Sequence, residues 1–69
     1  MARGILNADT NLRTGPGTDY KARALVGKNR GVEILDSRSD RDWVKVRVAQ
    51  GDYAGLVGWM HKDNVDSDR

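Results

Sequence analysis

The sequence predicts an all-β fold: a small barrel of about five short strands with a long loop and one 3-10 turn. Three observations lead to this fold class. No long stretch has the apolar spacing of a helix, the eight glycines fall at short intervals, and short β-branched runs lie between the turn signals. Closing such a short sheet into a barrel would also protect its edges.

The N-terminal third contains few regular patterns. The first short strand is expected to begin with Leu6 and Ala8. Leu12 and Leu25 are then predicted to be isolated core anchors in a long irregular segment. A defined turn lies within it at residues 14–17, because Pro16 fixes φ near about −65° and the flanking glycines can adopt positive φ.

The clearest strand covers residues 43–48, where Val44, Val46 and Val48 alternate with polar or aromatic residues. Side chains in a strand alternate between two faces, so the valine face should form the core. A second strand is expected at residues 32–35. A third, at residues 56–60, should pair with residues 43–48 through a hairpin at 50–55. Residues 61–64 then suit one 3-10 turn, and Val65 would close the barrel.

Length and charge limit the functional classes. The 69 residues fit one domain, 1–69, with a core at about 6–65, and the absence of cysteine excludes disulfides and thiolate chemistry. Twelve Lys and Arg against ten Asp and Glu are mixed along the chain, which argues against a nucleic-acid surface. That class would be favoured only if folding gathered the scattered cations on one face: Arg23, Lys28, Arg30 and Arg38.

The sequence gives no indication of membrane insertion. No apolar run approaches the roughly 20 residues that cross a bilayer. The first six residues also lack the apolar core of a signal peptide. The chain is therefore either cytosolic or a module of a longer exported protein, and the second interpretation is preferred on the resemblance described next.

Three motifs resemble those of bacterial Src-homology-3 (SH3, also SH3b or SH3 type 3) domains. The run NLRTGPGTDY at residues 11–20 resembles the family signature, which reads roughly LNVRSGPGTxY. The run WVKV at 43–46 resembles the family's Trp-x-Lys-Val strand, and GWMH at 58–61 resembles its Gly-Trp-Val-His element. Order and spacing agree from about residue 6 to 65. The resemblance implies an SH3-like barrel.

The chain departs from the family pattern at three places. Thr10 stands where the family usually has an apolar residue, and the connection at residues 26–31 is slightly longer. Asn64 occupies a position near the closing helical turn that is often tyrosine. In the family that aromatic can contribute to a ligand groove.

The resemblance also implies a function. Family members typically occur as modules of bacterial and phage cell-wall hydrolases and of other envelope or surface proteins. The usual inference is binding to peptidoglycan or its peptide bridges, although some members bind proteins. The chain is accordingly expected to be a monomeric module of a larger protein, in the cell envelope or outside the cell.

The residues offer little for catalysis, so the chain is predicted not to be an enzyme. His61 is the only histidine, and no cysteine is present to pair with it. A Ser–His–Asp triad could be drawn only with Ser37 or Ser39, and no spacing supports it. No zinc or EF-hand spacing occurs, so neither a metal nor another cofactor is expected.

The candidate ligand-binding residues are mostly aromatic or charged. Trp43 should lie outside the barrel, with Lys45 and Arg47 on the same face of the strand. The indole would then offer apolar contact area to a ligand, and the two cations could bind its carboxylates. Asp19, Tyr20 and His61 complete the predicted site. Each also has a structural interpretation. Trp43 would cover a barrel end under the loop at 36–42, Tyr20 would pin its loop, Asp19 would cap a turn, and His61 would be an ordinary surface residue.

Other conspicuous residues are interpreted as structural. Trp59 should pack against the sheet while Met60 takes the core position. Arg13 should form an ion pair or hydrogen bond near the turn. The leading hypothesis is an envelope-binding module; a protein–protein module, using the Trp43 face or an exposed sheet edge, is the alternative. Nucleic-acid binding comes third, and its steep salt dependence would distinguish it.

Overall fold

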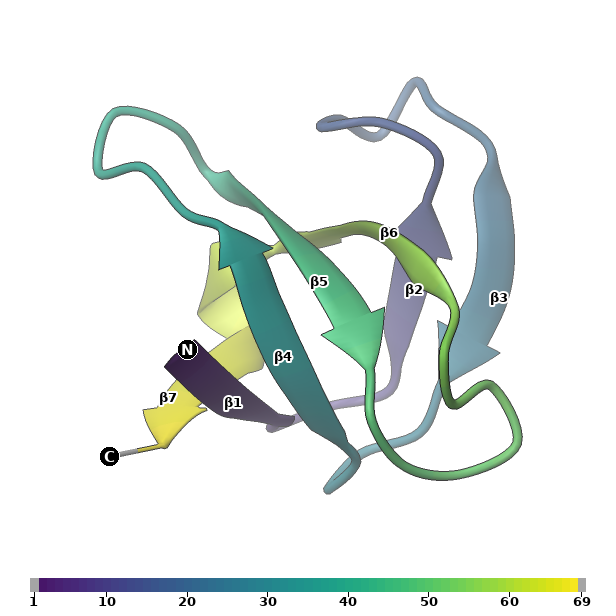
Figure 1. Ribbon diagram of the computed structural model, residues 1–69. Helices are drawn as coiled ribbons and strands as arrows, with labels where there is room; N and C mark the ends of the chain where they lie inside the picture. The colour runs from purple at the N-terminus through teal and green to yellow at the C-terminus, as the bar shows by residue number, and fades with distance from the viewer. Residues whose placement is uncertain (1, 69) are drawn as a thin grey trace.

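The computed structural model describes residues 2–68 and has the all-β architecture that the sequence predicts (Figure 1). Seven antiparallel strands form one sheet in the order β3-β2-β6-β5-β4-β1-β7. The elements are β1 (Ala2–Leu6), β2 (Thr10–Arg13), β3 (Ala22–Val26), β4 (Gly31–Asp36), β5 (Trp43–Val48), β6 (Val57–His61), the 3-10 turn η1 (Lys62–Asn64) and β7 (Val65–Asp68). Within residues 2–68, no helix is both long and apolar enough to span a membrane.

The structure has seven strands and not about five, mainly because the segment predicted to be irregular contains β2 and β3. Strand β1 ends at Leu6, where the first strand was expected to begin, and residues 7–8 form a bend. It pairs with β4 on one side and with β7 on the other, so the first and last strands lie side by side (Figure 1).

The segment predicted to be irregular contains a hairpin of β2 and β3, and residues 14–21 form the long loop between them. Leu12 is a core residue, as expected, and is fully buried on β2. The prediction for Leu25 was wrong, because its side chain is 57% exposed. Its neighbours Ala24 and Val26 are buried, so the alternation along β3 turns Leu25 outward despite its hydrophobicity.

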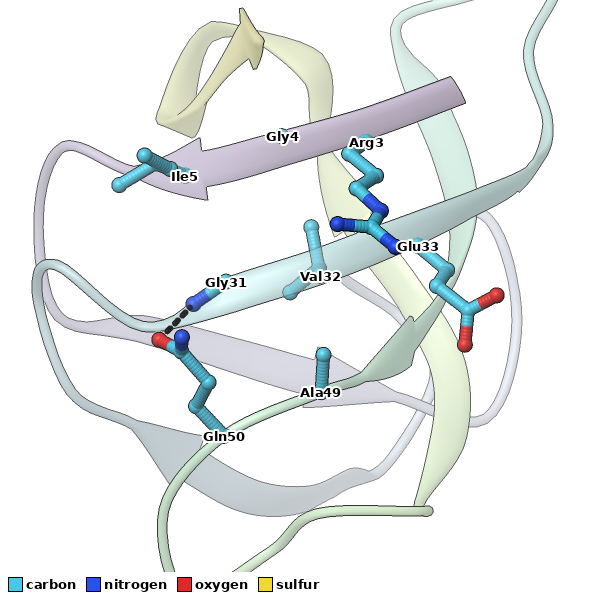
Figure 2. Close-up of a pocket in the computed structure, with 8 residues that line it drawn as sticks. All are labelled: Arg3, Gly4, Ile5, Gly31, Val32, Glu33, Ala49 and Gln50. Atoms are coloured by element: carbon cyan, nitrogen blue, oxygen red, sulfur yellow. Dashed lines mark hydrogen bonds between the residues drawn. The ribbon is translucent and has the colours of Figure 1, made fainter. Parts of the chain in front are cut away.

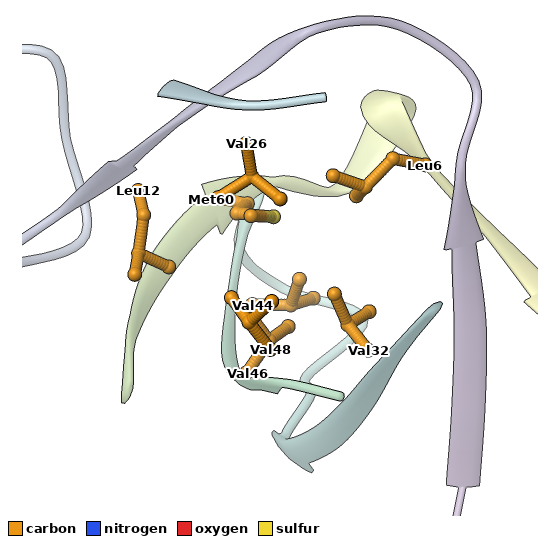
Figure 3. Close-up of a cluster of buried hydrophobic side chains, with 8 residues drawn as sticks. All are labelled: Leu6, Leu12, Val26, Val32, Val44, Val46, Val48 and Met60. Carbon is orange, nitrogen blue, oxygen red and sulfur yellow. The ribbon is translucent and has the colours of Figure 1, made fainter. Parts of the chain in front are cut away.

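The core lies between the inward faces of the strands (Figure 3). The three valines of β5 point inward, as the alternation predicts, and Met60 of β6 is fully buried against them. Burying each such side chain contributes about 1.5–3 kcal/mol relative to exposure. The complete cluster comprises Leu6, Leu12, Val26, Val32, Val44, Val46, Val48 and Met60.

Strand β2 crosses β6 closely at Gly58 and then diverges from it. An added Cβ on Gly58 would lie 2.7 Å from the carbonyl oxygen of Arg13 and 2.7 Å from Cγ of Leu12. The two strands pair only at Arg13 and Trp59. At the beginning of β6, Nη1 of Arg23 donates to the carbonyl oxygen of Val57 at 2.6 Å. This side chain thus supplies a hydrogen-bond partner for that carbonyl.

Candidate functional site

An open groove lies where β5 begins and β6 ends, and we call it the Trp43 groove. Trp43 and His61 are register partners on these two strands, and their rings meet edge to face with centroids 5.4 Å apart. Both side chains are half-buried. The groove has a volume of about 320 Å³ and is lined by Asp9, Thr10, Asn11, Arg13, Thr18, Trp43, His61 and Asn64.

The orientation of His61 is set by the 3-10 turn that follows it. His61 is the N-cap of η1, and its Nδ1 accepts a hydrogen bond from the backbone N–H of Asp63 at 3.2 Å. An Nδ1 that accepts leaves the proton of the neutral ring on Nε2, which is then the donor available to a ligand. The start of η1 is held in turn by Lys62, whose N–H donates to the carbonyl of Asp42 at 2.8 Å.

Asn64 is placed in the groove by the bend between β1 and β2. The backbone N–H of Asn7 donates to the carbonyl of Asn64 at 3.0 Å, and the Asn7 Nδ2 donates to the carbonyl of Asp63 at 2.8 Å. These bonds join segments more than 50 residues apart in the sequence. The resemblance to the family marks this position as one that is often tyrosine, so the amide stands where an aromatic ring would add contact area.

Polar groups also line the base of the groove. Thr10, at 4% exposure, donates its hydroxyl to the carbonyl of Ala8 at 2.7 Å. A buried hydroxyl with a partner costs little, which explains why threonine is tolerated where the family usually has an apolar residue. Asp9 accepts the backbone N–H of Lys28 at 2.8 Å, and this bond orders the connection between β3 and β4.

The turn after β2 forms a further edge of the groove. The Arg13 Nη1 donates to the carbonyl oxygens of Thr18, at 3.3 Å, and Tyr20, at 2.9 Å. The Tyr20 ring packs over Gly15, where any Cβ would overlap it, and also lies near Gly17. Arg13 therefore has the structural role expected of it, and Tyr20 pins the turn while remaining 48% exposed.

We expect Arg13→Lys to destabilise the domain by about 1–2 kcal/mol, because the shorter, differently shaped lysine side chain does not place its nitrogen where Nη1 of Arg13 donates to both carbonyls of the turn. Urea unfolding of both proteins measures the difference. The control is Arg38→Lys, because the exposed Arg38 side chain makes no hydrogen bond or ion pair among the described residues; it should leave stability within about 0.5 kcal/mol. Equal stability of Arg13→Lys and the parent protein would show that Arg13 does not hold the turn.

Lys45 and Arg47 continue along the outer face of β5, away from the groove. Lys45 is the register partner of Trp59 on β6, and Arg47 forms an ion pair with Glu33 of β4 at 3.4 Å. Trp59 is half-buried and covered by Arg41 of the 36–42 loop, whose guanidinium carbon lies 4.9 Å from the ring centroid. This contact agrees with the structural role predicted for Trp59.

The structure thus divides the predicted residues into three groups. Trp43 and His61 line the groove together. Asp19 and Tyr20 lie in the turn directly after Thr18, and the two cations of β5 lie beyond the groove. Sequence reasoning missed Asp9, Asn11 and Thr18 as lining residues. The signal for Asn11 and Thr18 was present, since both belong to the signature-like run at residues 11–20.

The arrangement suits the binding of a short polar chain. The indole offers apolar area, while two asparagine amides and a threonine hydroxyl can both donate and accept hydrogen bonds. Among residues 2–68, no group of three or more His, Asp or Glu side chains is arranged to hold a metal ion. An extended peptide, whose backbone alternates donors and acceptors, matches such a lining.

Comparisons with known proteins agree with this architecture. The family model described as "Bacterial SH3 domain" matches residues 8–66. A Bacillus subtilis (strain 168) protein, provisionally named N-acetylmuramoyl-L-alanine amidase YrvJ, is 34% identical over 56 residues, which are 81% of this chain. The chain spans about 10% of the length of that relative. No solved structure matches the chain significantly.

Proposed function

The chain belongs to the bacterial SH3 domain family, and on that basis we propose that it is a non-catalytic binding module that targets a larger protein to peptidoglycan or its peptide bridges. The observation that carries the proposal is the Trp43 groove. It combines one half-buried indole with amide and hydroxyl groups around an open volume of about 320 Å³. Bound peptide would lie against Trp43 and exchange hydrogen bonds with Asn11, Asn64 and Nε2 of His61.

The relative supports the choice of ligand. Its name refers to N-acetylmuramoyl-L-alanine, a unit of peptidoglycan, and this chain aligns with about a tenth of that protein. A part of that size suits a targeting role, in which binding raises the local concentration of substrate for a separate catalytic region. A shallow, open groove should bind weakly, at micromolar to millimolar dissociation constants, since it removes little ligand surface from water.

The remaining predicted residues have secondary roles in this proposal. Tyr20 and Asp19 would extend the contact from the turn next to Thr18, with the Asp19 carboxylate available to a ligand amine. Lys45 and Arg47 would meet carboxylates of a ligand that extends along β5. Each of these contacts should be individually small, because exposed ion pairs contribute about 0.2–1 kcal/mol.

A second candidate function is supported by edge strand β3. Leu25 exposes 57% of its surface there, and β3 has a strand partner on one side only. A partner protein could add a strand at this edge. The register shift opposite residues 12–13 and the charge of Arg23 both disfavour such pairing, so this candidate ranks second.

Co-sedimentation with purified peptidoglycan sacculi tests the proposal, with cellulose as a polysaccharide control. We expect the folded protein to sediment with sacculi and not with cellulose, with a shallow dependence on salt. A steep loss of binding with salt would indicate charge-driven adsorption. Protein that stays in the supernatant with several wall types would refute the peptidoglycan role and make a protein partner the better candidate.

We predict that Asn64→Tyr strengthens binding to sacculi by about threefold to tenfold. A ring at this position would add aromatic contact worth about 0.5–1.5 kcal/mol opposite Trp43. Asn64→Gln, which keeps the amide, is the matched control and should change binding little. The ratio of sacculus-bound to free protein measures both. Weaker binding by Asn64→Tyr would contradict this prediction and would mean that the lost amide hydrogen bonds outweigh the added ring contact.

A further inference from the structure

A second hollow lies on the outer face of β1 and β4, next to the chain that leaves β5 (Figure 2). Its volume is about 280 Å³, and none of the residues that line it belongs to the Trp43 groove. Figure 2 shows Ile5 and Gln50 at one end and Arg3 and Glu33 at the other. Of the residues proposed to contact a ligand of the Trp43 groove, Arg47 alone reaches this surface, through its ion pair with Glu33. We call the surface the Gly31 hollow and consider it separately.

The apolar part of the hollow exists because its central residue is glycine. Gly31 is the register partner of Ile5, and on its other side it accepts a hydrogen bond from the N–H of Ala49 at 2.9 Å. Because Gly31 has no side chain, a gap remains between the apolar side chains of Ile5 and Ala49. Ile5 is 43% exposed, and Ala49 is also exposed. The gap is therefore open to one apolar side chain of a ligand.

A fixed amide borders this gap. The Oε1 of Gln50 accepts the backbone N–H of Gly31 at 2.9 Å. A Cβ on Gly31 would lie 3.4 Å from Cδ and Oε1 of Gln50, so the glycine also makes room for this contact. Because Oε1 is engaged, the carboxamide is held in one orientation, and no protein acceptor for its Nε2 is found within residues 2–68. Its N–H groups are preorganised donors.

The other end of the hollow is charged, because Arg3 and Glu33 both belong to its lining. Glu33 is the register partner of Arg3 on β1 and of Arg47 on β5. Its Oε1 lies 3.4 Å from Nη1 of Arg47, and both of these side chains are partly exposed. Along these three register partners, two guanidinium groups therefore lie on either side of one carboxylate. Guanidinium groups in this arrangement suit one further carboxylate, supplied by a ligand.

We propose that the Gly31 hollow is a second peptide-binding site, specific for a short segment of a partner protein in which an apolar side chain adjoins a carboxylate. The apolar side chain fills the gap over Gly31, between Ile5 and Ala49. The carboxylate meets the guanidinium groups of Arg3 and Arg47, and a backbone carbonyl accepts from Nε2 of Gln50. The carboxylate belongs either to an acidic side chain or to a chain terminus, and the test below separates these sources.

The test is a titration of ¹⁵N-labelled protein, followed by two-dimensional NMR, with three capped dipeptide probes at up to about 10 mM. Acetyl-Leu-Asp-amide carries a side-chain carboxylate, acetyl-Gly-Leu with a free C-terminus carries a terminal one, and acetyl-Leu-Asn-amide carries none. We expect saturable shifts of the amides of Ile5, Gly31 and Ala49 with at least one acidic probe. The neutral probe should bind about threefold or more weakly.

Variants assign the shifts to this site. Arg3→Gln should weaken binding of the acidic probe about threefold, whereas Lys28→Gln, which removes an exposed cation elsewhere, should not. Gly31→Ala should weaken both acidic and neutral probes by placing a methyl group in the gap. Trp43→Ala should leave the titration unchanged, which separates this site from the proposed function. Equal binding of acidic and neutral probes, shifts confined to the Trp43 groove, or no saturable shift would overturn the proposal.

Discussion

Replacing Trp43 with alanine is expected to weaken binding to peptidoglycan sacculi by about 30-fold, which removes detectable co-sedimentation at micromolar protein. The indole is the largest apolar surface of the Trp43 groove and meets His61 edge to face with centroids 5.4 Å apart. Truncation to alanine deletes this surface and leaves the imidazole without its packing partner. Buried aromatic anchors of this kind typically carry about 2 kcal/mol or more of a binding free energy.

Tyr53→Ala is the matched control for this prediction. Tyr53 is 46% exposed, lies between β5 and β6, and does not line the groove. Its loss should leave sacculus binding within about twofold of the parent. Circular dichroism of each variant establishes that it is folded before binding is compared. A folded Trp43→Ala protein that binds as well as the parent would place the binding surface elsewhere.

Substituting Gly58 with alanine should destabilise the fold by about 2–3 kcal/mol. The added methyl group would lie 2.7 Å from the carbonyl oxygen of Arg13 and 2.7 Å from Cγ of Leu12. Backbone on one side and a fully buried side chain on the other leave little space for adjustment. The total stability of a domain this small is roughly 3–10 kcal/mol, so this change is a large fraction of it.

Thermal unfolding measures this effect, and the expected decrease in melting temperature for Gly58→Ala is about 10–20 °C. Gly27→Ala provides the control, because a Cβ at Gly27 meets nothing within 4 Å. That substitution should be neutral or slightly stabilising, since alanine restricts the unfolded chain. Similar melting temperatures for Gly58→Ala and Gly27→Ala would contradict the close crossing of β2 over β6.

The elements that the sequence predicted well are those with strict alternation. Strand β5 has the predicted bounds, because inward valines alternate with outward residues along its whole length. Strand β1 was missed because its inward positions are Gly4 and Leu6, and one glycine gives no hydrophobic signal. A Cβ on Gly4 would lie 2.5 Å from Cγ1 of Val65, so this position is small for a reason that only the tertiary structure reveals.

The groove was predicted in part. The two family-like motifs at 43–46 and 58–61 contain Trp43 and His61, and the hairpin register that places them opposite each other follows from pairing β5 with β6. Asp9 carries no such signal, because it lies in the irregular segment between β1 and β2 and its carboxylate is held by a hydrogen bond from the N–H of Lys28, 19 residues away. The inward position of Asn64 likewise depends on its contact with Asn7. Contacts between irregular segments have no periodicity from which they could be predicted.

The most direct test of the central claim is an NMR titration of the ¹⁵N-labelled protein with soluble peptidoglycan fragments that retain their peptides. We predict saturable shifts centred on the indole N–H of Trp43 and on the amides of Asn11, Thr18 and Asn64, which surround the groove. Fragments stripped of peptide should produce no such shifts. Saturable binding centred on another surface, or an unchanged spectrum at millimolar fragment, would contradict the assignment of the Trp43 groove as a peptidoglycan-binding site.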